Sequence, residues 1–264
     1  MTRRRTPKWL QAARAADAGF RSGEKPDWIA RALARAGILP PAEAEAAVRA
    51  GRVEVAGRQV REPLALVRPG DEVRLDGRQV DLRARTRVLA FHKPAGVVTS
   101  TVDREGIGTV FERLAAVLPP ALRGYGWHAV GRLDRNTTGL LLFTNDERFV
   151  AHATLPATHL PKRYVARVQG RADDEKLEPL RRGILLDDGP ARPAAVKRRG
   201  PDEVELTITE GRYHQVKRML AAVGLPVRAL HREAVGGLVL DVPEGAVREL
   251  DPEEIRTHLG WPPG

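Results

Sequence analysis

The chain has 264 residues, enough for two domains, and 42% of them are hydrophobic, so a sizeable core can form. The formal net charge of +10 favours a polyanionic partner such as nucleic acid, although a generally basic proteome would give the same value. The sequence has no cysteine, which excludes disulfides, thiolate catalysis and cysteine-based zinc sites. No apolar run approaches the roughly 20 residues of a membrane helix. The basic start lacks the apolar region of a secretory signal, so we expect a soluble cytoplasmic protein.

Residues 1–26 contain seven basic and two acidic side chains, which gives a charge of +5 in about a tenth of the chain. Such a segment is typical of a flexible basic arm that makes non-specific contacts with phosphates. A plain disordered terminus explains the same composition equally well.

Residues 27–80 predict a small separate unit. Asp27 is a candidate cap for a helix that Gly37 would end, and residues 42–50 form a second helix. Short strands with turn signals follow at 52–55 and 72–75. Residues 81–87 are charged and lack apolar periodicity, as in a linker.

This unit resembles an S4 RNA-binding domain, because it has two helices, a G-x-V-x-V-x-G stretch from Gly51 and a P-G-D-x-V stretch from Pro69. The sequence departs from the S4 pattern at Pro40-Pro41-Ala42, where the family usually has Ser-Arg-Arg. This departure removes expected phosphate contacts. Two alternatives follow: other arginines contact the RNA instead, with Arg31, Arg35, Arg49 and Arg52 as candidates, or this domain binds RNA weakly.

Residues 88–264 predict a mixed α/β domain. Apolar residues alternate at Val204, Leu206 and Ile208, which indicates a half-buried strand, and consecutive strands favour antiparallel pairing. Helices are predicted at 109–117 and 173–182. We therefore expect an α+β fold, in which helices flank a mixed and mainly antiparallel sheet.

A charged loop between Gly131 and Gly139 runs directly into the apolar stretch 140–143. This stretch is short and continuous, as in a strand inside a sheet, and such a strand is a rigid support for a functional loop. Asp134 lies between Arg132 and Arg135, whose charges favour an ionised carboxylate that serves as a nucleophile or a base. Taken alone, the loop favours a solvated turn that contains an ordinary ion pair, because Arg and Asp are common in loops.

A second charged stretch, 209–219, leads into a predicted helix that Gly224 ends. Its apolar residues have helical spacing and form one buried face, which consists of Val216, Met219, Leu220 and Val223. The opposite side carries His214, Lys217 and Arg218, and would be an ordinary solvated face in the absence of a motif.

Together these stretches resemble the motifs of the RsuA family of rRNA pseudouridine synthases. The first is similar to the family signature GRLD followed by TTGLLL and T-N-D, and the second to EG-x-x-HQV-[KR]-RM. Between them, Lys162-Arg163-Tyr164 is similar to the K-x-Y of the family. The order and rough spacing match, and the resemblance runs from about Lys25 to the end of the chain.

The resemblance implies that Asp134 is the catalytic carboxylate, which attacks C1′ or the uracil ring or first removes a sugar proton. Tyr164 would stack on the uracil, and Lys217, or else Arg218, would pair with Asp134. Arg132 would replace the flipped base in the RNA or steady the flipped nucleotide. His214 and Gln215 would brace the loop or touch a phosphate. Lys93 would contact the RNA backbone, unless it is a solvated turn lysine.

Isomerising uridine to pseudouridine neither oxidises nor adds anything, so no cofactor is expected. No phosphate-binding glycine motif or H-E-x-x-H spacing is present, so no metal is expected either. The resemblance is greatest to the small-subunit (16S) rRNA enzyme, and 23S rRNA is the alternative substrate. A non-catalytic RNA-binding protein of ribosome assembly is the second alternative. The expected partner is rRNA in an assembly intermediate, bound by a monomer.

Overall fold

The computed structural model describes residues 26–82, 85–103, 106–155 and 158–261. The chain divides into two compact units. The first contains the described residues up to Arg85 together with 122–126, and the second contains 86–121 and the residues from Trp127 onward. The predicted basic arm, apart from Pro26, lies outside the described residues, as do two positions of the predicted linker.

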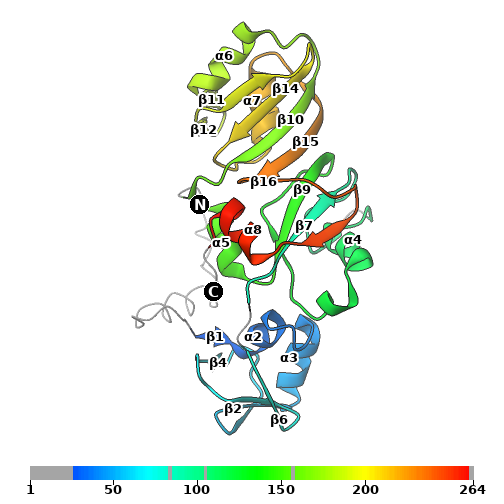
Figure 1. Cartoon of the computed structure of the whole chain (residues 1–264), viewed down its shortest axis with the longest axis vertical. Helices are drawn as coiled ribbons and strands as arrows, with labels where there is room; N and C mark the ends of the chain where they lie inside the picture. Colours follow the sequence, from blue (N-terminus) through cyan, green and yellow to red (C-terminus); the bar gives the residue numbers. More distant parts are fainter. Residues whose placement is uncertain (1–25, 83–84, 104–105, 156–157, 262–264) are drawn as a thin grey trace, which may run out of the picture. The chain divides into compact units, whose positions relative to one another are not determined.

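The first unit consists of two helices and a small β-ribbon (Figure 1). Its helices are α2 (Ile29–Arg35) and α3 (Pro41–Arg49). The four-stranded antiparallel ribbon has the order β3 (Arg58–Val60), β2 (Val53–Val55), β5 (Val73–Leu75) and β6 (Arg78–Val80), and β1 (Asp27–Trp28) pairs with β4 (Leu66–Val67). Ile29 and Leu33 of α2, Val48 of α3, and Val53 and Val73 of the ribbon share one core.

Asp27 does not cap α2 as predicted, because Trp28 occupies the N-cap position and makes no side-chain cap bond. The Asp27 carboxylate instead pairs with two arginines of the same helix, Arg31 and Arg35. Local spacing misidentified the role of Asp27 because two guanidinium groups compete for its oxygens.

The second unit is built on one nine-stranded sheet, which confirms the predicted mixed and mainly antiparallel architecture. Its main path has the order β13 (Ala195–Arg198), β14 (Glu203–Ile208), β10 (Lys162–Val168), β15 (Val227–Val235), β9 (Thr137–Thr144), β7 (Val88–Lys93) and β17 (Val247–Glu249). In addition, β16 (Leu238–Val239) pairs with β15, and β8 (His128–Val130) pairs with β9. A separate hairpin consists of β11 (Leu185–Leu186) and β12 (Gly189–Pro190). The β9–β15 pair is parallel, whereas the other pairs described in the sheet are antiparallel.

Strand β9 lies in the middle of this sheet, as its apolar sequence predicts, with β7 on one side and β15 and β8 on the other. Gly139 makes the approach to β15 possible. A Cβ at this position would overlap the backbone of Arg232, and the φ of +110° also disfavours other residues. The Arg232 guanidinium donates to the Leu140 carbonyl over 2.7 Å and links the two strands. The start of β9, which directly follows the Asp134 loop, is therefore fixed from both sides.

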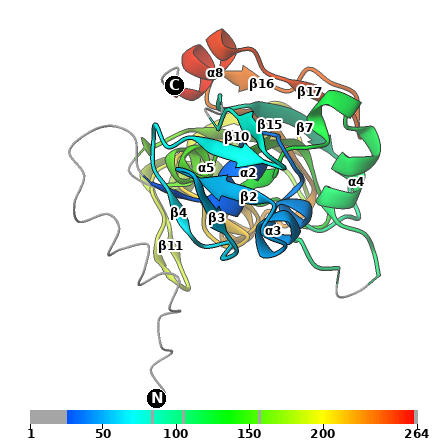
Figure 2. The ribbon, with the colours of Figure 1, turned by 90° about the horizontal axis from the view of Figure 1, so that it is seen from below.

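Helices cover this sheet, and three of them, α4 (Val110–Val117), α5 (Glu147–Thr154) and α8 (Pro252–Leu259), begin at residues whose side chains cap the helix. Thr109 forms a capping box with Glu112 at α4, and Asp146 caps α5. The remaining helices are α6 (Asp174–Arg182) and α7 (Gln215–Ala222), and a 3-10 turn occupies Pro120–Leu122. Helix α8 lies beside β16 in both views (Figures 1 and 2).

Alternate residues of the central strands form the core under α5 and α8. Leu140 and Leu142 of β9 pack there with Val88, Phe149 and Leu259. Within the described ranges, no helix is long and apolar enough to cross a membrane.

Candidate active site

The backbone of the loop that carries Asp134 is bound on both sides of this residue. The Thr99 hydroxyl donates to the Leu133 carbonyl over 2.8 Å and accepts from the Leu133 amide at 3.3 Å. On the other side, the Gly96 amide donates to the Arg135 carbonyl over 2.9 Å. A turn closes when the Thr137 amide donates to the Asp134 carbonyl. The Asp134 side chain therefore projects from a loop whose backbone is held by hydrogen bonds on both sides.

Lys93, at the end of β7, completes this support from inside the protein. Its side chain is fully buried, and its ammonium donates to the carbonyls of Pro94, Arg135 and Thr137 at 2.9–3.0 Å. Burial lowers the pKa of Lys93 from 10.5 to about 8, whereas the negative charge of Asp134 opposes the shift. The expectation that Lys93 contacts RNA or lies in a solvated turn is wrong for this structure, because the ammonium points at the underside of the Asp134 loop.

The carboxylate of Asp134 is paired with two side chains from the start of α7. Lys217 Nζ lies 2.8 Å from Asp134 Oδ2, and His214 Nε2 lies 3.2 Å from Oδ1. All three side chains are partly exposed, at 26% for Asp134, 31% for Lys217 and 37% for His214. The site is therefore half-desolvated and remains open to a substrate, so its charges interact more strongly than fully solvated ones would.

The sequence of α7 explains why these two side chains reach the carboxylate. Val216, Met219 and Leu220 are buried, as the helical spacing predicts, so Lys217 lies on the other side. His214 has a left-handed backbone conformation with φ of +50°, which turns the chain directly before the helix. That turn orients the His214 ring toward Asp134, at a position where a non-glycine residue is uncommon.

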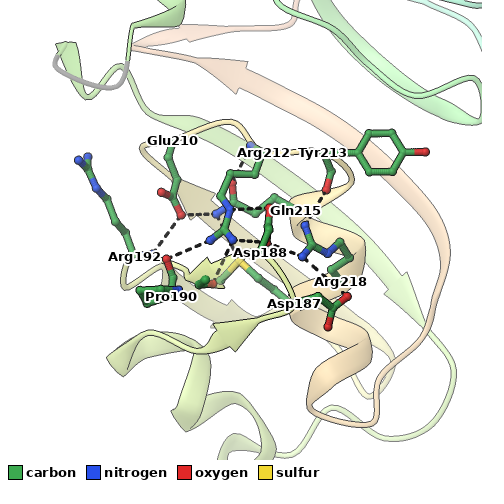
Figure 3. A network of polar contacts seen from close by, with 11 residues as sticks. Asp187, Asp188, Pro190, Arg192, Glu210, Arg212, Tyr213, Gln215 and Arg218 are labelled. Atoms are coloured by element: carbon green, nitrogen blue, oxygen red, sulfur yellow. Dashed lines mark hydrogen bonds and ion pairs between the residues drawn. The ribbon is translucent and has the colours of Figure 1, made fainter. Parts of the chain in front are cut away.

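Arg218, the other candidate partner of Asp134, lies in a different network (Figure 3). It donates to Asp188 over 2.5 Å, and Arg212 also binds Asp188. These two arginines, Arg218 first, hold the pKa of the Asp188 carboxyl far below its usual range. Arg218 donates from its other nitrogen to the Tyr213 carbonyl at 3.2 Å. The hairpin that carries Asp188 therefore binds the loop before α7 and the helix itself.

Gln215 is buried and braces the same loop. Its amide nitrogen donates to Glu210 over 2.5 Å, and its oxygen accepts from the Arg212 amide at 3.0 Å. The sequence left open whether Gln215 braces the loop or binds RNA, and its bonds show a bracing role.

Tyr164 lies on β10 and is 9% exposed. In the sheet register Tyr164 is opposite Arg232, and Arg232 is opposite Gly139, so Tyr164 lies two strands from the start of β9. Arg132 is exposed and lines a groove of about 540 Å³ beside the Asp134 loop. Other walls of this groove are Thr99, Trp127, His128 and Glu147.

The four arginines predicted to bind RNA in the first unit all pair with acidic side chains. Arg31 and Arg35 bind Asp27, Arg49 binds Glu45, and Arg52 binds Asp76. Arg31 also lies over the Trp28 ring, 4.7 Å from its centroid. These pairs are largely solvated except at Asp27, so they contribute little stability and leave the arginines able to exchange partners.

Sequence reasoning missed three residues near Asp134, namely Thr99, Asp188 and Tyr213. Asp188 lies in a short hairpin, and nothing in the local sequence indicated its arginine partners. Tyr213 directly precedes His214 in a polar stretch, and this position could have been recognised from the sequence. The structure adds that its side chain is 73% exposed. Within the part of the chain that the structure describes, no group of three potential metal ligands occurs.

Comparison with known proteins agrees with this geometry. The RNA pseudouridylate synthase family model matches residues 87–222, and the S4 domain model matches residues 28–73. Ribosomal large subunit pseudouridine synthase B from Escherichia coli K12 is 40% identical over 234 residues, covering 84% of this chain and 79% of that protein. The Vibrio cholerae protein of the same name is 38% identical over 237 residues and covers 86% and 72%.

A crystal structure of a pseudouridylate synthase superposes with a TM-score of 0.60 at 31% identity, covering 86% of this chain and 97% of the other. The mixed sheet, the S4 match and the relatives agree with one another. The chain belongs to the RNA pseudouridylate synthase family, and in this chain an S4 domain precedes the synthase domain.

Proposed function

We propose that this enzyme isomerises a uridine of large-subunit (23S) rRNA to pseudouridine, with Asp134 as its catalytic carboxylate. The observation that carries the proposal is the placement of Asp134. Lys93 and Thr99 bind the backbone carbonyls of the two residues that flank Asp134. The Asp134 carboxylate is paired with Lys217 and His214 at a solvent-accessible position.

The reaction breaks the N1–C1′ bond of uridine, forms a C5–C1′ bond and removes the proton from C5. Atoms and electrons balance within one nucleotide, so a carboxylate and a proton acceptor suffice. Lys217 favours the anionic form of Asp134 and fixes its orientation, because an ammonium 2.8 Å from a carboxylate stabilises the charged state.

Tyr164 and Arg132 complete the proposed site. Tyr164 stacks on the uracil, and Arg132 steadies the flipped nucleotide at the mouth of the groove that it lines. Flipping costs a few kcal/mol, and least in an irregular RNA region. The target uridine therefore lies in a loop or bulge of the rRNA.

The proposed substrate differs from the small-subunit rRNA that the motifs favoured. The curated relatives that match most of this chain are named for the large subunit, which supports the 23S alternative. The motifs around Asp134 and Lys217 serve the shared chemistry, so they discriminate poorly between the two RNAs. We propose further that the enzyme acts in the cytoplasm as a monomer, on RNA in a ribosomal assembly intermediate.

The test uses purified full-length protein and unmodified transcripts of both rRNAs, with pseudouridine mapped at nucleotide resolution. We expect one modified region in 23S rRNA. Asp134→Asn is expected to abolish product while it still binds RNA, because the variant keeps the shape but loses the charge. Asp134→Glu, which displaces the carboxylate by one methylene, is expected to lose most activity as well.

Three outcomes would contradict parts of the proposal. Modification of 16S rRNA alone would restore the original substrate expectation and keep the chemistry. Turnover by Asp134→Asn would overturn the catalytic assignment. RNA binding without modification of either transcript would favour a non-catalytic protein of ribosome assembly, provided that assembly intermediates also remain unmodified.

A further inference from the structure

Tyr213 is an exposed aromatic residue beside the proposed catalytic carboxylate. Its side chain is 73% exposed, although tyrosine usually buries most of its ring. One face of the ring stacks on His214, with centroids 3.8 Å apart and planes inclined by 20°. His214 in turn lies 3.2 Å from Asp134, so the stack ends at the reacting group.

The position of Tyr213 is fixed by the surrounding polar network. Its carbonyl accepts from Arg218, and Arg218 is bound by Asp188. The left-handed backbone of His214 turns the chain directly after Tyr213. Figure 3 shows the Tyr213 ring pointing away from the network, in which Arg212 and Arg218 reach toward Asp188.

We infer that Tyr213 is a stacking platform for an unpaired base of the RNA substrate next to the target uridine. The inference rests on the proposed function. Single-stranded RNA is recognised through bases that stack on aromatic side chains, and every base has a face suited to this contact. One face of Tyr213 covers His214, and the large exposure of the ring leaves area for a base. The platform binds a base that flipping has unstacked, at a site separate from the uracil contact proposed for Tyr164.

The first experiment measures the dissociation constant and steady-state constants with the rRNA fragment found to be modified. Tyr213→Ala is expected to weaken RNA binding and raise KM about 10-fold, the size of one lost stacking contact. Tyr213→Phe keeps the ring and should bind like wild type. Tyr213→Leu keeps apolar cover over His214 without an aromatic face, so it should resemble the alanine variant. Val239→Ala, at another exposed apolar side chain, is the matched control.

A merely structural role gives a different pattern. If Tyr213 only supports His214, Tyr213→Ala lowers kcat and leaves RNA affinity unchanged, whereas Tyr213→Leu has the wild-type kcat. That result would overturn the inference, as would wild-type constants in all three variants.

A second experiment detects the contact directly and does not depend on turnover. Asp134→Asn protein is mixed with the same RNA carrying 5-iodouridine, which crosslinks to stacked aromatic rings, at single positions flanking the target. We expect a photo-crosslink to Tyr213 from one flanking position and none in Asp134→Asn, Tyr213→Leu protein. Crosslinks only to other residues would refute the platform. If wild type modifies no rRNA, the proposed function fails and no flanking position is defined; a weaker RNA affinity of Tyr213→Ala would then still show that the ring binds RNA, whereas unchanged affinity would refute the platform as well.

Discussion

The two sides of the Asp134 loop use their positive charges differently. On the sheet side, Lys93 is fully buried and binds backbone carbonyls of the loop. On the helix side, Lys217 is partly exposed and binds the Asp134 carboxylate itself. Lys93 determines where Asp134 lies, and Lys217 determines the charge and orientation of the Asp134 side chain. Replacing the two lysines should therefore damage different properties of the enzyme.

The largest expected effect on stability comes from Lys93→Met, which leaves three carbonyls without their common donor. We expect a loss of about 2 kcal/mol in the free energy of unfolding at pH 7.5, because unsatisfied buried acceptors cost more than the relieved burial of a charge. Denaturant unfolding measures this loss. Equal stability of variant and wild type would show that the carbonyls find other partners.

The same variant has a distinct pH dependence. The folded-state pKa of Lys93 is about 8 and its ordinary pKa is 10.5, so the unfolded chain binds more protons between these values. Wild-type stability should therefore rise relative to Lys93→Met from pH 8 to pH 10.5, by about 3 kcal/mol in total. A constant difference across this window would contradict the burial of a charged lysine.

The next largest effect is expected for Lys217→Met. Loss of the ammonium beside Asp134 should lower kcat about 30-fold, or about 2 kcal/mol in activation free energy, with a small change in stability. Steady-state kinetics and unfolding measure the two quantities. Lys176→Met, at an exposed lysine of α6, controls for loss of surface charge. An equal decrease in stability and activity would place Lys217 among the structural residues.

Asp188→Asn should have a smaller effect, because the asparagine still accepts one hydrogen bond from the two arginines. We expect kcat/KM to fall about 5-fold, since Arg212 and Arg218 lose the charge that anchors the loop before α7. Asp187→Asn is the matched control, because this neighbour is fully exposed and lies 3.9 Å from Arg218. Equal effects of the two substitutions would assign the loss to surface charge.

Thr99→Val should have an effect of similar size, on stability instead of activity. It removes the hydroxyl that binds both polar groups of Leu133, which should cost about 1 kcal/mol of stability. Thr101→Val, on an exposed neighbour, is the control. An unchanged unfolding midpoint would show that a water molecule replaces the hydroxyl.

These contacts also show what the sequence could reveal. Periodicity predicted the central strand β9 and the buried face of α7, because both depend on local spacing. The motif order led to Asp134 and Lys217, which the structure brings to 2.8 Å. The prediction for Lys93 was wrong, because a lysine beside a Pro-Ala-Gly turn usually lies in water. Its three acceptors come together only in the tertiary structure. Arg218 was ambiguous for a similar reason, since its partner Asp188 lies 30 residues earlier in a hairpin.

The parallel contact between β9 and β15 has a consequence for synthesis of the protein. Arg232 and Leu140 are bonded although they are 92 positions apart in the chain. A ribosome that is making this protein completes Asp134 long before it adds β15 and α7. Contacts of such high sequence separation form late and slowly. The nascent chain is therefore expected to stay inactive until most of the synthase domain has been translated, so that its first turnover follows its last major folding step.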